Sequence, residues 1–469
     1  MVFSSLTFLF YFLPAFLLLY FLVSKKTKNM VIFLGSLIFY YYGVKDQPAY
    51  VLLMLLSILV NYKAARKIEK QTEQRGRKIW LITGLTYNMG CLFVFKYLDF
   101  VCVNINTALG WAGTGTRLPY AELVLPIGIS FYTFQITSYL IDVYWGKIPA
   151  EPSILTLGTY LCMFPQLIAG PIVTYSQVRE QLRDRRQSLS NLEEGLREFT
   201  IGLGLKVLIA NQMGALWGQV GTIGYESIST PLAWLGLGAF SFQIYFDFYG
   251  YSLMAKGLGM IMGFRFPDNF RDPYLSKSMT EFWRRWHMTL GSWFREYVYI
   301  PLGGNRSHLY RNLLIVWMLT GLWHGASWNY VLWGLFICLL VCVEKLGVKK
   351  LLERVPLLGH LYMLFVIPLS WMLFAITDLG KLGVYVGRLF PFLAGSGSAA
   401  VFPGDFVKYG RMYLFSLLAA LICCTGLPRK LYEKRKASLL TALTLVAVFW
   451  ACAYCMYMGL DDPFLYYQF

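Results

Sequence analysis

The stretch LTGLWHGASWNYVLWG, residues 319–334, places a single ionisable side chain, His324, among tryptophans, glycines and aliphatic residues. An imidazole titrates near neutral pH, so it can accept a proton from a hydroxyl group as a general base. Ionisable residues inside a membrane segment are costly to bury and are therefore functional candidates. The alternative is a structural histidine that is hydrogen-bonded to a neighbour such as Thr320 or Ser327. These residues alone do not decide between the two.

Two other roles for His324 depend on partners elsewhere in the chain. A haem or metal site needs a second strong ligand at helical spacing, and the sequence around His324 offers none, so we expect no metal site. A proton relay in a transporter needs carboxylates inside the membrane, for which Asp142 and Asp247 are the main candidates. A multi-helix transporter with His324 in a proton or substrate pathway is therefore the alternative to an enzyme.

The segment SMTEFWRRWHMTLGSWFREYVYIPLGGNR, residues 278–306, precedes this stretch and is rich in tryptophan and arginine. Ser278 and Glu281 have the spacing of a capping box, which predicts that a helix starts there. At about 100° per residue, large apolar side chains share one face of this helix. They are Met279, Phe282, Trp283, Trp286, Leu290, Trp293 and Tyr297. We expect an interfacial helix over 278–298, lying in the plane of the membrane surface.

With the helix in this position, the arginines of the segment face cytoplasmic water; they are Arg284, Arg285, Arg295 and Arg306. Arg284, Arg285 and Arg306 are the ones singled out for substrate binding. They are candidates to bind the phosphates of a cytosolic donor such as coenzyme A, because guanidinium groups bind phosphate in a fixed geometry. The alternative is that the helix only anchors the protein at the membrane surface, with its arginine side chains extending into water. His287 lies on the flank of the same helix, where a lone histidine is more often structural than catalytic.

The composition of the whole chain is that of a membrane protein. Of its 469 residues 57% are hydrophobic and only 14% are charged, and the mean hydropathy is +0.51. Long continuous apolar runs favour helices over a barrel, so we expect an all-α polytopic protein with about 10–12 transmembrane helices in one membrane domain, 1–469. The candidate spans are 3–23, 30–44, 48–62, 79–103, 121–145, 154–174, 198–222, 230–262, 311–344, 360–378, 409–427 and 437–459.

The net charge of +17 lies in short loops between these runs, where Lys and Arg set the topology, so we expect no nucleic-acid partner. The most basic loop, 63–78, should be cytoplasmic, which puts the N-terminus outside. The basic loop 179–186 is then also cytoplasmic only if one segment between 119 and 174 does not cross the membrane. The stretch FPQLIAGPI, 164–172, has two prolines and a glycine and predicts a broken or re-entrant segment there.

The run 311–344 is long for one span, because a helix rises only about 1.5 Å per residue. We expect it to form a broken hairpin, with Gly321, Gly325 and Gly334 easing the bends. Such a break would place His324 within the membrane.

Two blocks, RRWH (284–287) and WHG (323–325), resemble the membrane-bound O-acyltransferase (MBOAT) family, and more closely its alginate O-acetyltransferase branch. Further stretches of the chain are similar to the same branch. They are MVFSSLTFLFYFLP at the start, FPQLIAGPI, YFDFYGYSLMAKGLGMIMGFRFPDNF (245–270) and PFLYYQF at the end. The resemblance covers nearly the whole chain. It implies the MBOAT fold, with its core over about residues 120–380 and re-entrant and interfacial helices around a central funnel.

The resemblance also implies a reaction. The family's catalytic histidine falls on His324, as general base, and the histidine that supports the site falls on His287. The implied donor is acetyl-CoA from the cytosol, with no bound cofactor. The acceptor is an extracytoplasmic polysaccharide, reached with the help of an extracytoplasmic SGNH-like acetyltransferase partner. The implied location is the inner (plasma) membrane of a bacterium.

Within this mechanism, Trp323 and Trp328 would keep the funnel dry, which limits thioester hydrolysis. Asn329 and Ser327 would donate hydrogen bonds to the developing oxyanion, or serve only as polar groups in helix packing.

One departure from the family pattern concerns the stretch DFYGYSLMA, for which the resemblance predicts DFSGYSDMA. Tyr249 stands in place of a serine and Leu253 in place of an aspartate. The loss of this acid implies a different acceptor or partner, or a neutral replacement; the sequence leaves both open.

Overall fold

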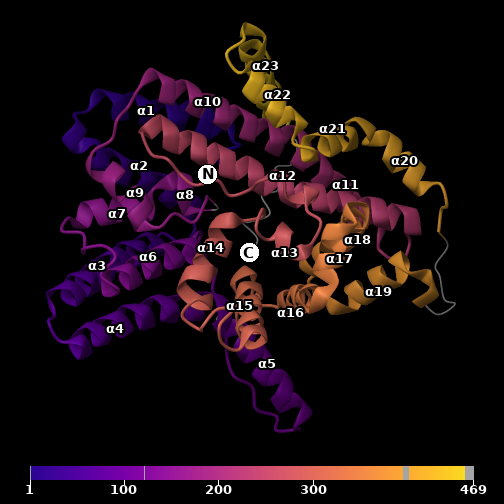
Figure 1. Ribbon diagram of the computed structural model, residues 1–469, viewed down its shortest axis with the longest axis horizontal. Helices are drawn as coiled ribbons and strands as arrows, with labels where there is room; N and C mark the ends of the chain where they lie inside the picture. The colour runs from indigo at the N-terminus through magenta and orange to yellow at the C-terminus, as the bar shows by residue number, and fades with distance from the viewer. Residues whose placement is uncertain (1, 121, 169, 394–400, 460–469) are drawn as a thin grey trace. The chain divides into compact units, whose positions relative to one another are not determined.

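The computed structural model describes residues 2–120, 122–168, 170–393 and 401–459. The regular elements in these ranges are all helical, as the apolar runs predicted, and no strand occurs in them (Figure 1). The PFLYYQF segment, 463–469, lies outside the described residues. The chain forms two compact units, one of residues 1–196 with 255–267 and one of residues 197–254 with 268–469.

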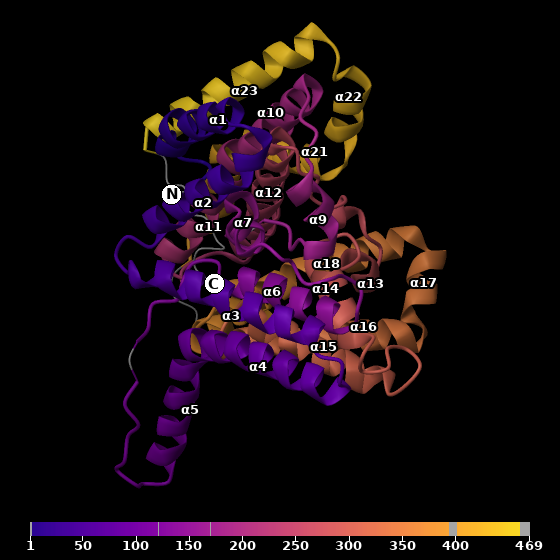
Figure 2. The same cartoon turned by 90° about the vertical axis from the view of Figure 1, so that its left-hand side faces the viewer.

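The first unit contains the N-terminal helices. They are η1 (Phe8–Phe12), α1 (Leu13–Leu22), η2 (Lys25–Thr27), α2 (Lys28–Gly43), α3 (Ala49–Lys70), α4 (Gln74–Leu92), η3 (Phe93–Tyr97), α5 (Leu98–Trp111), α6 (Ile129–Tyr144), α7 (Ile154–Cys162), α8 (Phe164–Leu167), α9 (Tyr175–Arg183) and the start of α10 (Leu189–Gly204). The hairpin of α3 and α4 packs against α6, whose residues are nearly all buried, and α2 packs on α7. Helix α5 continues α4 and projects away from the other helices of this unit (Figure 2).

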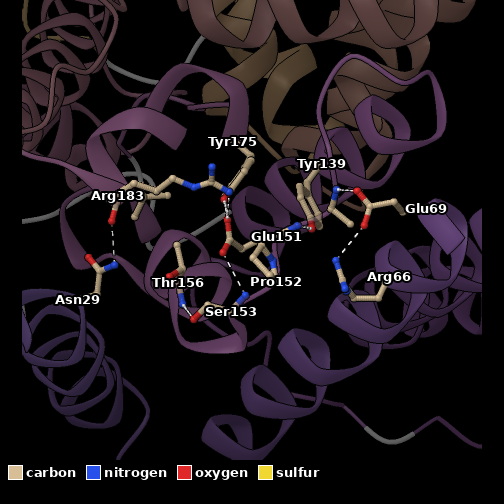
Figure 3. Close-up of polar contacts among 12 residues, drawn as sticks. Asn29, Arg66, Glu69, Tyr139, Glu151, Pro152, Ser153, Thr156, Tyr175 and Arg183 are labelled. Atoms are coloured by element: carbon tan, nitrogen blue, oxygen red, sulfur yellow. Dashed lines mark hydrogen bonds and ion pairs between the residues drawn. The ribbon is translucent and has the colours of Figure 1, made fainter. Parts of the chain in front are cut away.

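The loop after α6 is held by Glu151, which is buried. Its carboxylate accepts hydrogen bonds from the Tyr175 hydroxyl and, at 3.1 Å, from the Ser153 N–H, and it lies 3.4 Å from the Arg183 guanidinium (Figure 3). The Glu151 N–H donates to the Tyr139 hydroxyl at 2.9 Å. A buried carboxylate is tolerated when it is paired in this way. The network ties α9 to α6.

The second unit contains the remaining helices. They are the end of α10, η4 (Leu205–Ala210), α11 (Asn211–Ile223), α12 (Thr230–Met262), η5 (Pro273–Leu275), α13 (Met279–Phe282), α14 (Met288–Phe294), η6 (Arg295–Tyr299), α15 (Leu309–His324), α16 (Trp328–Val343), η7 (Glu344–Val348), α17 (Lys349–Arg354), α18 (Pro356–Ala375), α19 (Leu379–Leu389), η8 (Pro391–Leu393), α20 (Asp405–Met412), α21 (Leu414–Cys424), α22 (Leu427–Arg435) and α23 (Leu439–Tyr457). The last residues of α12, from Ala255 on, belong to the first unit.

Five helical stretches of the described chain are long and apolar enough to cross a membrane, and a pair bent by 69° would form a sixth. They are Gln74–Trp111, Leu189–Ile223, Trp328–Arg354, Pro356–Ala375 and Leu439–Tyr457, with the bent pair Asp405–Met412 and Leu414–Cys424. Other expected spans coincide with shorter helices, such as the 16 residues of α2 and of α6. The chain is therefore an all-α polytopic membrane protein.

The predicted break at 164–172 is confirmed. Helix α7 has nine residues and ends at Cys162, Met163 is non-helical, and α8 has only four residues. Nine residues at about 1.5 Å each span about 14 Å, well short of the roughly 30 Å hydrocarbon core. This part of the chain does not form one continuous spanning helix.

The predicted broken hairpin over 311–344 is also confirmed. Helix α15 ends at His324, Gly325 is extended, and α16 begins at Trp328. The two helices lie in backbone contact: a Cβ on Gly321 would come within 2.4 Å of the Tyr330 carbonyl oxygen, and one on Gly334 within 2.5 Å of the Trp317 carbonyl oxygen. Glycines are what allow two helices to approach so closely.

The expectation of one continuous helix over 278–298 is wrong. The predicted start is right, since the Ser278 hydroxyl accepts a hydrogen bond from the Glu281 N–H at 3.1 Å. The helix stops after Phe282, however, and the chain passes through His287 in the left-handed conformation, φ 43° and ψ 52°, before α14 begins. The periodic apolar pattern in the sequence indicates which side chains are buried. It continues across residues 283–287, so it did not predict that the helix is interrupted there.

The apolar face of this segment is buried against the protein's own side chains. The Trp286 ring lies 4.8 Å from the Trp371 ring of α18 and 5.0 Å from the Phe270 ring. The buried carboxylate of Glu344, at the end of α16, accepts hydrogen bonds from the backbone N–H groups of Met279 and Thr280 at 2.5 and 2.8 Å. These contacts position α13 on α16.

Candidate active site

His324 is the last residue of α15, and its side chain is 4% exposed. Three aromatic rings surround the imidazole, with centroid distances of 4.9 Å to Trp323, 5.1 Å to Trp333 and 5.1 Å to Phe374. Each ring is close to perpendicular to the imidazole, at 74°, 86° and 81°. We call these three rings the aromatic cage. It places an ionisable group in surroundings from which water is largely excluded.

Gly325 and Asn329, which follow His324 in the chain, shape the cage. Gly325 allows the Tyr330 ring to approach, because a Cβ at position 325 would lie 2.2 Å from that ring. The buried Asn329 amide donates to the carbonyl oxygens of Leu373 and Phe374 at 3.2 and 3.3 Å. Both N–H bonds of Asn329 are thereby used to hold the end of α18, where Phe374 lies. This geometry favours a packing role for Asn329 over oxyanion binding.

His287 lies beside this cage. It precedes α14, is 1% exposed, and its ring is perpendicular to the Phe248 ring at 4.6 Å. The Trp323 indole lies 6.0 Å from the His287 ring and 4.9 Å from the His324 ring. The structure therefore brings together both histidines proposed from the sequence, with Trp323 against each of them.

Asn269 orients the His287 ring. Its Oδ1 accepts hydrogen bonds from the Thr289 hydroxyl at 2.8 Å and the Thr289 N–H at 3.3 Å, so the His287 Nδ1, 3.0 Å away, must donate to it as well. The Asn269 amide group donates to the Ser252 hydroxyl at 3.2 Å, and its backbone carbonyl oxygen accepts from the Met288 N–H at 2.9 Å. The hydrogen-bond network thus assigns the Nδ1–H tautomer.

The opposite nitrogen of His287, Nε2, then carries a lone pair. It is buried and has no hydrogen-bond partner among the described residues. Burial lowers the pKa of His287 to about 3, because the charged form is poorly solvated there. His287 is therefore a neutral imidazole that can accept one more hydrogen bond.

The remaining residues proposed from the sequence lie at more exposed positions. The Arg285 guanidinium is paired with the Glu281 carboxylate at 2.7 Å, and Arg284 and Arg306 are exposed. Trp328, the first residue of α16, is 52% exposed. The structure does not place these four side chains among the rings of the aromatic cage.

Three contributors to the site were missed in the sequence. Trp333 and Phe374 supply two walls of the cage, and Phe374 comes from α18, remote in sequence from the histidine. Asn269 was within the stretch 245–270 that carries the family resemblance, and that was its only signal. Nothing in its local sequence indicates a bond to His287.

The two departures from the family pattern take different positions on α12. The Tyr249 ring stacks on the Tyr245 ring at 5.5 Å and 5°. Leu253 is buried where α12 crosses α10, since a Cβ on Gly202 would lie 2.9 Å from the Leu253 Cβ. An aspartate at position 253 would be buried in that crossing, and leucine fits it as an apolar packing residue.

The carboxylates considered for a proton relay are both engaged in ion pairs. Asp142, in the first unit, lies 3.6 Å from the Lys147 ammonium. Asp247, in the second unit, lies 2.8 Å from the Lys206 ammonium, and both of these side chains are buried. Each carboxylate is therefore compensated by a partner of its own.

Comparison with known proteins places this site in a family. Residues 147–377 match the membrane-bound O-acyltransferase family. A probable alginate O-acetylase of Pseudomonas aeruginosa is 38% identical over 81% of this chain and 73% of its own length. A peptidoglycan O-acetyltransferase of Helicobacter pylori is 35% identical over 81% of this chain and 78% of its own length, and a teichoic acid D-alanyltransferase of Streptococcus thermophilus is 31% identical over 45% and 54%. The chain belongs to the membrane-bound O-acyltransferase family.

Proposed function

We propose that this O-acyltransferase moves an acetyl group from acetyl-CoA across a bacterial inner membrane, for the O-acetylation of an extracytoplasmic polysaccharide, with His324 as general base. The observation that carries the proposal is the burial of the His324 imidazole inside the aromatic cage. The relatives named for the acetylation of alginate and of peptidoglycan support an acetyl group and a polysaccharide acceptor.

In the proposed reaction, the His324 imidazole accepts the proton of an acceptor hydroxyl while that oxygen attacks the thioester carbonyl. The new ester C–O bond forms, the C–S bond breaks, and the imidazolium returns the proton to the departing thiolate. A positioned general base contributes about 10²–10⁴-fold in rate. The aromatic cage excludes water, which would otherwise hydrolyse the thioester.

His287 has a supporting role in this proposal. Its buried Nε2 accepts a hydrogen bond from an N–H or O–H group of a bound substrate, and Asn269 positions the ring for that contact. The exposed guanidinium groups of Arg284 and Arg306 are available for the phosphates of coenzyme A, whereas Arg285 is paired with Glu281. An extracytoplasmic SGNH-like partner would receive the acetyl group and pass it to the polysaccharide.

The transporter alternative has less support. Its candidate carboxylates, Asp142 and Asp247, are held in ion pairs, and the chain belongs to a family of acyltransferases. A measurement of coenzyme A release separates the two alternatives, because a transporter would release none from acetyl-CoA.

The test is His324→Ala in the native host, with His360→Ala as the matched control because His360 is exposed and lies within α18. We expect His324→Ala to abolish acetylation of the polysaccharide while the protein still accumulates in the membrane, and His360→Ala to acetylate normally. Retained acetylation in His324→Ala would end the catalytic assignment.

A further inference from the structure

Two buried cations meet in the first unit. Lys28, the first residue of α2, is 8% exposed, and Arg185, which follows α9, is 9% exposed. The Lys28 ammonium donates to the Gln187 side-chain oxygen and lies 4.7 Å from the Tyr20 ring centre. The Arg185 guanidinium donates to the Asn29 side-chain oxygen at 2.7 Å. We call these five residues the Lys28–Arg185 cluster.

The cluster has two positive charges and no carboxylate. In the described part of the chain, neither Lys28 nor Arg185 forms an ion pair with an acidic side chain. Arg183, two residues before Arg185, shows the contrast: its side chain is 49% exposed, yet it pairs with Glu151 (Figure 3). Burial, and secondly the neighbouring charge of Arg185, lower the pKa of Lys28. Buried charges are costly unless they are compensated, so this arrangement calls for an anion.

An additional donor points in the same direction. The side-chain nitrogen of Gln187, Nε2, is buried and has no hydrogen-bond partner among the described residues. The ammonium of Lys28, the guanidinium of Arg185 and this amide supply several N–H groups from two separate segments of the chain. This set of donors suits the oxygens of a phosphate group.

The helix that precedes the cluster indicates which kind of molecule the phosphate belongs to. Helix α1 ends at Leu22, shortly before Lys28, and its outer residues Leu18, Leu19 and Leu22 are 64%, 52% and 74% exposed. In a membrane protein such a face lies against lipid acyl chains. A phosphate bound at Lys28 and Arg185 would therefore have room for acyl chains along α1.

We propose that the Lys28–Arg185 cluster binds the phosphate of an anionic phospholipid, with the acyl chains along the exposed face of α1. The coenzyme A phosphates have the same chemistry, and the experiment below separates the two sources. This site is independent of the acyl-transfer mechanism proposed for His324.

The experiment measures thermal unfolding of the purified full-length protein in detergent, with added phosphatidylglycerol, phosphatidylcholine or coenzyme A. The test variant is Lys28→Met with Arg185→Gln, and the control is Lys25→Gln with Lys26→Gln, which removes two exposed charges from the neighbouring turn. Phosphatidylglycerol should stabilise the wild type and the control. The test variant should need roughly tenfold more lipid or show no stabilisation, because charge-assisted hydrogen bonds are lost. In phosphatidylcholine the test variant should be at least as stable as the wild type, since two uncompensated charges have been removed.

Equal stabilisation of the test variant and the wild type by phosphatidylglycerol would overturn the proposal, as would a wild type that does not distinguish phosphatidylglycerol from phosphatidylcholine. Stabilisation of the wild type by coenzyme A and not by phosphatidylglycerol, lost in the test variant, would overturn the lipid assignment. The cluster would then bind the phosphates of coenzyme A. If the double variant does not accumulate, Lys28→Gln alone is measured by native mass spectrometry, where loss of retained phosphatidylglycerol is expected and undiminished retention would contradict the proposal.

Discussion

His287 and His324 are both buried, yet their surroundings suit them to different tasks. His324 lies at the end of a helix against three aromatic rings. His287 is fixed in one tautomer by Asn269, and burial keeps it neutral. A neutral ring with a buried lone pair is a hydrogen-bond acceptor, which supports the proposal that His287 orients the substrate while His324 transfers the proton.

The role of Asn269 predicts a change in pH dependence. In the wild type the pKa of His287 is about 3, so the ring stays neutral and contributes no pH dependence across about pH 5–9. In Asn269→Asp the new carboxylate favours the imidazolium and raises the pKa of His287. Transferase activity of this variant should therefore fall as the pH is lowered, because protonation removes the Nε2 acceptor. The measurement is the rate of acetyl transfer against pH.

A second variant removes the Asn269 side-chain amide altogether. Asn269→Ala removes the acceptor for the Nδ1–H and should lower activity about 10–100-fold, the effect known for residues that orient metal-bound histidines. A pH profile of Asn269→Asp that overlays that of the wild type, together with full activity of Asn269→Ala, would contradict the positioning role.

The hairpin of α15 and α16 carries His324, and its two helices are in contact through glycines. A Cβ on Gly321 would meet the Tyr330 carbonyl oxygen at 2.4 Å, and backbone atoms cannot move aside as a flexible side chain can. The position of His324 therefore depends on the close crossing of these two helices.

Gly321→Ala should force α15 and α16 apart. We expect a loss of about 1–3 kcal/mol in the free energy of unfolding, as for other overpacked sites, and a larger loss of activity because His324 moves out of the aromatic cage. Gly383→Ala in α19 is the matched control, because a Cβ there meets nothing within 4 Å. It should be neutral or stabilise by about 0.5–1 kcal/mol. The measurements are thermal unfolding and the rate of acetyl transfer for both variants. Equal stability and equal transfer rates of Gly321→Ala and Gly383→Ala would refute the packing argument.

The sidedness of the chain follows from its charges and from the interruption after α7. The basic segments 63–78 and 179–186 lie on the same side only if the chain between α6 and α9 does not add a crossing, and α7 is too short to add one. We therefore expect both segments to be cytoplasmic and the loop after α5 to be outside.

Cysteine labelling in intact cells tests this topology. Single cysteines replace the exposed residues Arg75, Thr114 and Arg186 in a protein without its nine native cysteines. An impermeant maleimide should label position 114 only, and positions 75 and 186 should react after the cells are opened. Labelling of position 186 in intact cells would show that the segment after α7 lies outside.

The sequence predicted the features that depend on length and hydropathy. The expected span 230–262 coincides with α12, and the interruptions at 164–172 and after His324 follow from prolines, glycines and the length of the apolar run. The break at His287 was not predicted, because the apolar periodicity continues through it. Asn269 and Phe374 were missed because each contacts its histidine from another segment of the chain. A local sequence pattern does not predict such contacts.

The central claim is that His324 transfers the proton in acyl transfer, and the most direct measurement is release of coenzyme A from acetyl-CoA by the purified protein with its acceptor or partner. His324→Gln is compared with His360→Gln, which changes an exposed histidine in the same way. We predict that His324→Gln releases coenzyme A at least about 100-fold more slowly than the wild type, as expected for loss of a general base, and that His360→Gln matches the wild type. Release by His324→Gln at the wild-type rate would contradict the account.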